Sequence, residues 1–150
     1  MNQQDYTTTI QSRASVRDTI EAIDRVGAWW TTSFQGAAQK PGDTFNVRFG
    51  ETFVNFTIVE HTATRIVWHV TESRLPWLKD ETEWTGTDVI WDVAVAGGET
   101  QVQMTHKGLV PQVECFENCK KGWNVYVGES LRKLLAEGQG SPDGKARSQT

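Results

Sequence analysis

His106 is the side chain whose type and position most suggest chemistry. It alternates in phase with Val102 and Met104, so a strand over these residues places the imidazole on an apolar face. A histidine there can contact a ligand, act as a general base, or serve as a hydrogen-bonded core group. Desolvation on that face disfavours the charged imidazole, so we expect the pKa of His106 to be lowered.

Two carboxylates, Glu60 and Glu83, are further polar candidates for the same apolar space. Glu60 is in phase with Phe56 and Ile58, so it either faces the concave side of the sheet or lies at the wet end of its strand. Glu83 adjoins a tryptophan, but the charged run over residues 79–83 is equally typical of a solvated loop. We treat Glu60, Glu83 and His106 as polar cavity candidates and assign no catalytic residue.

No other pattern indicates catalysis, a metal or a cofactor. The three histidines have no metal-ligand spacing, and the chain has neither a nucleotide-binding glycine loop nor a nucleophile–base pair. The two cysteines, Cys115 and Cys119, are four residues apart, a spacing with poor disulfide geometry inside a helix and too few ligands for zinc. We interpret both as small apolar side chains of a buried helix face.

Composition indicates a single globular domain and excludes several classes of partner. The chain has 150 residues and a net charge of −4, with 15 Lys and Arg scattered among 19 Asp and Glu. Scattered cations argue against nucleic acid, and no apolar run approaches the ~20 residues of a membrane span. The polar N-terminus has no secretory signature, so we expect a cytoplasmic protein.

Residues 111–137 contain the element around which the domain is built. Cys119, Trp123 and Val127 fall on one face and charged residues on the other, which predicts a core-facing helix about 40 Å long at ~1.5 Å per residue. Gly122 and Gly128 interrupt it off the core face, each at a cost of about 1 kcal/mol relative to alanine. A close backbone approach by another element, a bend in the helix or a dimer contact would each explain them. Residues 138–150 have little to bury and are predicted to be a disordered tail.

The preceding residues predict an antiparallel sheet with two short helices after its first strand. Alternating apolar residues indicate strands near 5–13, 44–49, 54–60, 66–70, 87–95 and 102–106. Ser15 is placed to cap a helix over 16–24, and a second helical turn carries Trp29 and Trp30. Turn residues such as Gly97-Gly98 join successive strands as hairpins. These elements predict an α+β domain over residues 1–137.

The order of elements and local motifs resembles the START-like (SRPBCC) helix-grip superfamily. Within it, the chain is similar to the C-terminal domain of the activator of heat-shock protein 90 ATPase, over about residues 5–142. The resemblance rests on Trp29-Trp30, Phe34-Gln35-Gly36, Gly42-Asp43-Thr44-Phe45, Phe56-Thr57-Ile58-Val59-Glu60, Arg65-Ile66-Val67-Trp68, Glu83-Trp84-Thr85-Gly86-Thr87, Thr105-His106-Lys107-Gly108-Leu109, Gly122-Trp123 and Ser130-Leu131.

This resemblance implies a curved antiparallel sheet of six or seven strands wrapped around the long C-terminal helix, with an apolar cavity between them. The side chains expected to line that cavity are Phe56, Ile58, Trp68, Val89, Trp91, Met104, His106, Cys119, Trp123 and Val127. We interpret the remaining tryptophans, Trp29, Trp30, Trp77 and Trp84, as plugs at the ends of the sheet or as parts of a lid or a partner-facing patch.

The leading functional hypothesis is non-catalytic binding of a small hydrophobic or aromatic molecule in this cavity, by a monomer or a homodimer. One alternative is a stress-related, co-chaperone-like module that binds a chaperone or another protein. The other is a cyclase- or hydrolase-like enzyme that uses His106 or Glu60 in the same cavity. An open pocket of about a few hundred Å³ favours the ligand and enzyme hypotheses, and a filled interior favours protein interaction.

Overall fold

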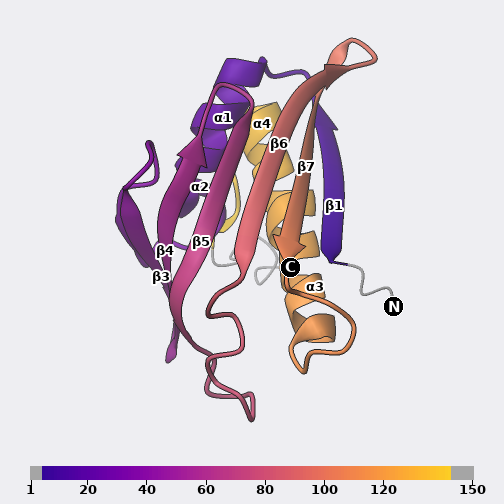
Figure 1. Cartoon of the computed structure of the whole chain (residues 1–150). Helices are drawn as coiled ribbons and strands as arrows, with labels where there is room; N and C mark the ends of the chain where they lie inside the picture. The colour runs from indigo at the N-terminus through magenta and orange to yellow at the C-terminus, as the bar shows by residue number, and fades with distance from the viewer. Residues whose placement is uncertain (1–4, 143–150) are drawn as a thin grey trace.

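The protein is described by a computed structural model covering residues 5–142. A seven-stranded sheet has the order β1-β7-β6-β5-β4-β3-β2 (Figure 1), and every neighbouring pair is antiparallel. The strands are β1 (Tyr6–Ser12), β2 (Phe34–Gly36), β3 (Thr44–Phe49), β4 (Thr52–His61), β5 (Arg65–Arg74), β6 (Asp88–Ala96) and β7 (Glu99–Lys107). The predicted α+β meander is confirmed, and the short strand β2 is additional to the predicted strands.

Helices cover one face of this sheet (Figure 1). Two short ones, α1 (Val16–Asp24) and α2 (Val26–Trp29), follow β1. The Ser15 hydroxyl accepts a hydrogen bond from the Asp18 backbone N–H, as the predicted cap requires. The long C-terminal helix comprises α3 (Phe116–Val125), a π-helical segment η1 (Tyr126–Leu131) and α4 (Arg132–Glu137), and it ends at the left-handed Gly138.

The C-terminal helix begins at Phe116, so the predicted start at residue 111 is wrong. Residues 111–115 form turns. The backbone N–H groups of Glu114 and Cys115 donate to the side chain of Glu83, on the loop before β6, at 3.0 and 2.9 Å. A carboxylate from elsewhere in the chain therefore binds these N–H groups at the point where the helix starts.

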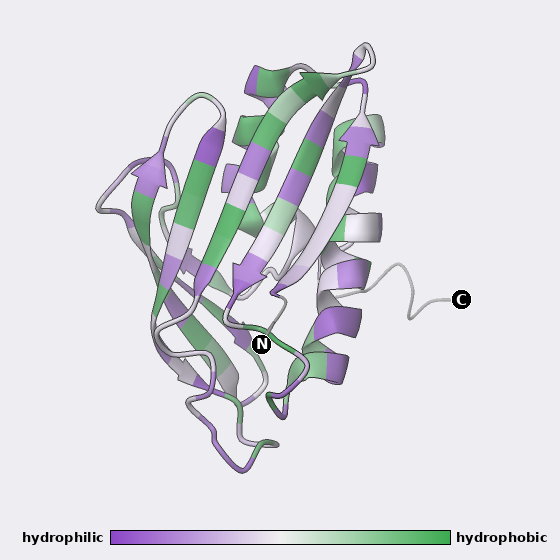
Figure 2. Cartoon of the chain, turned by 45° about the vertical axis from the view of Figure 1, so that its right-hand side comes forward, coloured by the Kyte–Doolittle hydropathy of each residue, from purple (hydrophilic) through white to green (hydrophobic). Residues whose placement is uncertain are grey.

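Hydrophobic and polar residues alternate along the strands (Figure 2), and the apolar residues of one phase, such as Val102 and Met104 of β7, are buried. The interior is mostly aromatic. Two indoles at the end of α2 stack over the sheet, with Trp29 and the C-cap residue Trp30 at 6.4 and 6.1 Å from Trp68, centroid to centroid. Trp30 also packs 5.9 Å from Phe56. These rings fill much of the space between sheet and helix.

The chain after the C-terminal helix returns to the helical layer. The backbone N–H of Ser141 donates to the Ser130 hydroxyl at 2.7 Å, and that hydroxyl donates to the Trp29 carbonyl at 2.6 Å. A Cβ added to Gly140 would lie 2.5 Å from the Ala28 carbonyl oxygen. The first residues of the predicted tail are thus packed, and its remainder, residues 143–150, lies outside the described residues.

Candidate functional site

His106 lies on β7 with both ring nitrogens in hydrogen bonds. The Trp123 indole N–H, from α3, donates to Nδ1 at 3.0 Å, so Nδ1 carries the lone pair and Nε2 carries the proton. Nε2 then donates to the Thr87 hydroxyl at 2.9 Å, and this hydroxyl donates to the Trp84 carbonyl at 2.6 Å. The imidazole therefore joins the sheet, the helix and the loop before β6 in one hydrogen-bonded chain.

The environment of His106 holds the imidazole neutral. The side chain is fully buried, and desolvation lowers its pKa from 6.5 to about 3. The inward orientation and the direction of the shift are as the strand phase predicted. Because neither nitrogen is free to accept a proton from a bound molecule, the arrangement is that of a satisfied core group and not that of a general base.

Glu60 does not face the concave side of the sheet. The register between β4 and β5 shifts between Ile58 and Glu60, which breaks the alternation on which the prediction depended. Its carboxylate lies 3.7 Å from Arg65, and the Glu60 side chain is 46% exposed. Glu60 therefore lies at the solvent-exposed end of its strand.

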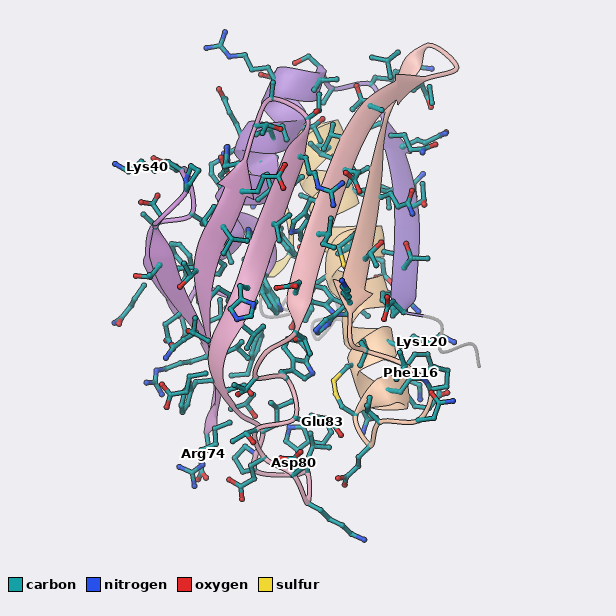
Figure 3. All side chains as sticks on the ribbon, viewed as in Figure 1. Lys40, Arg74, Asp80, Glu83, Phe116 and Lys120 are labelled. Carbon is teal, nitrogen blue, oxygen red and sulfur yellow. A yellow bond between two sulfur atoms is a disulfide. The ribbon has the colours of Figure 1, made fainter. Side chains whose placement is uncertain are left out.

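Glu83 lies outside the cavity as well, in the loop between β5 and β6 and beside the first turn of α3, which begins at Phe116 (Figure 3). Its carboxylate accepts the two backbone hydrogen bonds from Glu114 and Cys115, while the Glu114 carboxylate accepts one from the Lys79 backbone N–H at 2.9 Å. These reciprocal contacts fasten the loop to the start of the helix and so position the next residue, Trp84.

Most of the predicted cavity-lining side chains belong to a closed core. Eight of them are at most 1% exposed and do not border the apolar pocket described below: Phe56, Ile58, Trp68, Val89, Trp91, Met104, His106 and Val127. The rings of Trp29 and Trp30 occupy the space into which these side chains point. Of the predicted set, Cys119 and Trp123 do border an open pocket.

That pocket has a volume of about 160 Å³ and opens where the helix start meets the β3–β4 hairpin and the loop before β6. Its walls are Trp30, Phe49, Thr52, Val54, Trp84, Cys119, Gly122, Trp123 and Tyr126. No lining residue carries a formal charge when the cysteine is a thiol or a disulfide. The site is an apolar recess with aromatic walls.

The tryptophan walls of the pocket are held in fixed orientations. Trp84 and Trp123 stack with an interplanar angle of 12° and centroids 5.9 Å apart, and Trp30 lies 5.0 Å from Trp123. The Trp123 N–H is already donated to His106. Flat apolar surface is therefore the main recognition element that these walls offer.

Gly122 opens this recess from the helix side. It borders the pocket, and a Cβ added there would meet no atom within 4 Å. The pocket-lining residues Cys119 and Tyr126 are three residues before and four residues after it, so all three lie on one face of the helix. The sequence leaves Gly122 unexplained, and the structure shows that it borders the pocket.

A separate pair of ionisable groups, Asp24 and His61, lies at the ends of α1 and β4. Nε2 of His61 is 3.0 Å from each Asp24 carboxylate oxygen, and the side chains are 10% and 14% exposed for Asp24 and His61. Burial raises the pKa of Asp24 to about 6, against the opposing hydrogen bond from His61. Neither residue borders the apolar pocket, so we interpret the pair as a link between helix and sheet.

The structure records a disulfide between Cys115 and Cys119, with Cα atoms 5.6 Å apart. Our prediction of two unlinked side chains is therefore wrong. It assumed both residues inside a regular helix, whereas Cys115 occupies the N-cap position of α3. Within residues 5–142 there is no cluster of three potential metal ligands and no helix long and apolar enough to cross a membrane.

Known proteins share this architecture. The solution structure of the Aha1 dimer from Colwellia psychrerythraea matches with a TM-score of 0.74 and 21% identity, over 91% of this chain and 99% of that one. The structure of SSP2350 from Staphylococcus saprophyticus matches with a TM-score of 0.67 and 21% identity, over 91% and 95%. CalU16 from Micromonospora echinospora gives 0.64 and 11%, over 97% and 80%.

At these identities the structural matches show the fold alone. No curated protein matches the sequence. The family model for the Activator of Hsp90 ATPase homolog 1-like protein matches residues 14–136, which is most of the chain. The chain therefore belongs to the Activator of Hsp90 ATPase homolog 1-like family of the START-like superfamily.

Proposed function

We propose that the protein binds a small, flat, apolar molecule in the pocket between α3 and the β3–β4 hairpin, without catalysing a reaction on it. The observation that carries this proposal is the recess of about 160 Å³ with its aromatic walls. Apolar recesses with fixed aromatic walls are favourable sites for aromatic ligands, because contact area and ring geometry both contribute to binding.

The volume limits the size of the ligand. An engineered apolar cavity of ~150 Å³ takes up benzene, whereas pockets for drug-sized ligands are about 300–1,000 Å³. A ligand of one or two rings therefore suits this pocket, which is also partly open, so that a substituent can extend into solvent. The parallel planes of Trp84 and Trp123 favour planar molecules over bulky ones.

The placement of the polar candidates supports binding over catalysis. His106 has both nitrogens engaged, Glu60 is paired with Arg65 outside the recess, and Glu83 is bound to backbone N–H groups. A general acid or base must reach the reacting atom of its substrate. None of these three groups borders the recess.

A matched pair of glycine substitutions tests the proposal. Gly122→Leu should place an isobutyl group in the recess, whereas Gly128→Leu changes the same long helix at a position that borders a different, polar groove. An added Cβ meets no atom within 4 Å at either glycine. Leucine favours the helix over glycine, so loss of binding should not reflect unfolding.

The measurement is a titration with 1-aminonaphthalene, followed by quenching of tryptophan emission. We expect saturable quenching of the wild type, affinity weakened at least about tenfold in Gly122→Leu, and affinity within about twofold of wild type in Gly128→Leu. Unchanged emission of the wild type, or equal affinity in the two variants, would show that the recess does not bind the probe.

A further inference from the structure

We propose that Cys115 and Cys119 form a reversible thiol–disulfide site in the wall of the recess. Cys119 is the thiol that reacts with a small disulfide compound, and Cys115 is the thiol that then completes the internal bond. Reaction at Cys119 depends on the shape of the recess and not on a natural ligand.

The start of α3 brings the two cysteines together. Cys115 is the N-cap residue, Cys119 lies in the first turn, and the Cys119 backbone N–H donates to the Cys115 carbonyl at 2.8 Å. Their Cα separation of 5.6 Å is within the range that disulfides span, about 4.4–6.8 Å. Closing the bond therefore needs no movement of the helix backbone.

The two sulfur atoms are not equally accessible. Cys115 is fully buried, whereas Cys119 is 8% exposed and borders the recess. The Glu83 carboxylate binds the Cys115 backbone N–H and holds the loop before β6 against this residue. A reagent from solvent therefore reaches Cys119 first, through the recess, and Cys115 reacts only with the neighbouring cysteine.

The chemistry is thiol–disulfide exchange with a small disulfide, RSSR. The Cys119 thiolate attacks one sulfur of RSSR, which forms a mixed disulfide at Cys119 and releases RS⁻. The Cys115 thiolate then attacks the Cys119 sulfur, closes the internal disulfide and releases the second RS⁻. The two cysteine protons are taken up by the two RS⁻ groups, so RSSR is reduced to two RSH as the protein dithiol is oxidised.

The redox state of Cys115 and Cys119 affects the space that the recess offers to a ligand. The mixed disulfide at Cys119 would occupy the space that an apolar ligand needs, so ligand and RSSR should exclude one another. The closed disulfide fixes the turn whose Cys115 N–H binds Glu83, and the next residue along the loop is Trp84, a wall of the recess. Oxidation therefore fastens that wall to the helix.

Mass spectrometry of the full chain after reaction with 2-hydroxyethyl disulfide tests the order of the steps. Reduced wild type should lose both thiols without retaining an adduct, and dithiothreitol should restore them. Cys115→Ser should stop at a single adduct on Cys119, while Cys119→Ser should react at least about tenfold more slowly. A stable adduct on the wild type, or equal rates in the two serine variants, would overturn the proposal.

The glycine variants test the route through the recess and keep both cysteines. Gly122→Leu should slow modification of reduced Cys119 at least about tenfold relative to Gly128→Leu, because the leucine fills the approach to the sulfur. Equal rates in the two variants would contradict the proposal. If the aminonaphthalene fails to bind but the cysteine reactions follow the expected order, the binding function fails and the redox site stands.

Discussion

Acidification should destabilise the protein steeply through His106. The folded state holds this imidazole neutral with a pKa of about 3, whereas an unfolded chain takes up a proton near 6.5. The contribution of His106 to the free energy of unfolding is therefore complete above about pH 6.5. Below that pH it falls by about 1.4 kcal/mol for each pH unit. The loss reaches about 4 kcal/mol near pH 3.5, a large share of the stability of a typical domain.

The control for this prediction is His106→Gln, because the amide can accept from Trp123 and donate to Thr87 but does not titrate. Urea unfolding of both proteins across the pH range gives the difference due to His106 alone, since the carboxylates titrate equally in both. The free energy of unfolding of the wild type, relative to that of His106→Gln, should fall by about 1.4 kcal/mol for each pH unit below about 6.5. A difference that does not change between about pH 7 and pH 4 would show that the imidazole is not held neutral.

Removal of the Trp123 side chain should cost about 3–5 kcal/mol of unfolding free energy. The indole is 2% exposed, packs between Trp30 and Trp84, and donates its N–H to His106. Trp123→Ala therefore leaves a cavity and also leaves Nδ1 of His106 without a donor. Few side chains in this fold combine both losses.

Tyr126→Ala provides the comparison on the same helix, because Tyr126 also borders the recess but is only half-buried. Its truncation should lower the urea midpoint by clearly less than Trp123→Ala does. A loss below about 1 kcal/mol for Trp123→Ala would mean that this ring does not hold the helix to the sheet.

Local patterns predicted the architecture because they obey short-range rules. The cap at Ser15, the helix Val16–Asp24 and the strand Thr44–Phe49 follow from capping and from alternation of apolar residues, and each is confirmed. The inward position of His106 followed from the same alternation. These features depend on residues close together in sequence.

The errors arose where distant residues determine the local structure. The helix starts at Phe116 because the distant Glu83 carboxylate binds the N–H groups of Glu114 and Cys115, and periodicity cannot reveal such a partner. The bulge before Glu60 moved a predicted cavity residue to the surface by breaking an alternation of period two.

The location of the recess could not be predicted either, because it also depends on residues that are distant in sequence. A strand pattern shows which side chains point inward, but not which element fills the space that they face. Trp29 and Trp30, predicted to be plugs at the ends of the sheet or parts of a lid or partner-facing patch, lie against Trp68 in the interior. The centre is therefore closed, and the open space lies at one end. Trp84 reaches that end on an irregular loop, whose conformation has no periodic signal.

The most direct test of ligand binding in the recess is a set of intermolecular NMR cross-peaks between the ¹⁵N,¹³C-labelled protein and a small unlabelled aromatic such as toluene. We expect cross-peaks from toluene to the ring protons of Trp84 and Trp123 and to the Gly122 α-protons, the groups that border the recess. Cross-peaks only to residues outside this set, or none at saturating toluene, would contradict the assignment of this recess as the binding site.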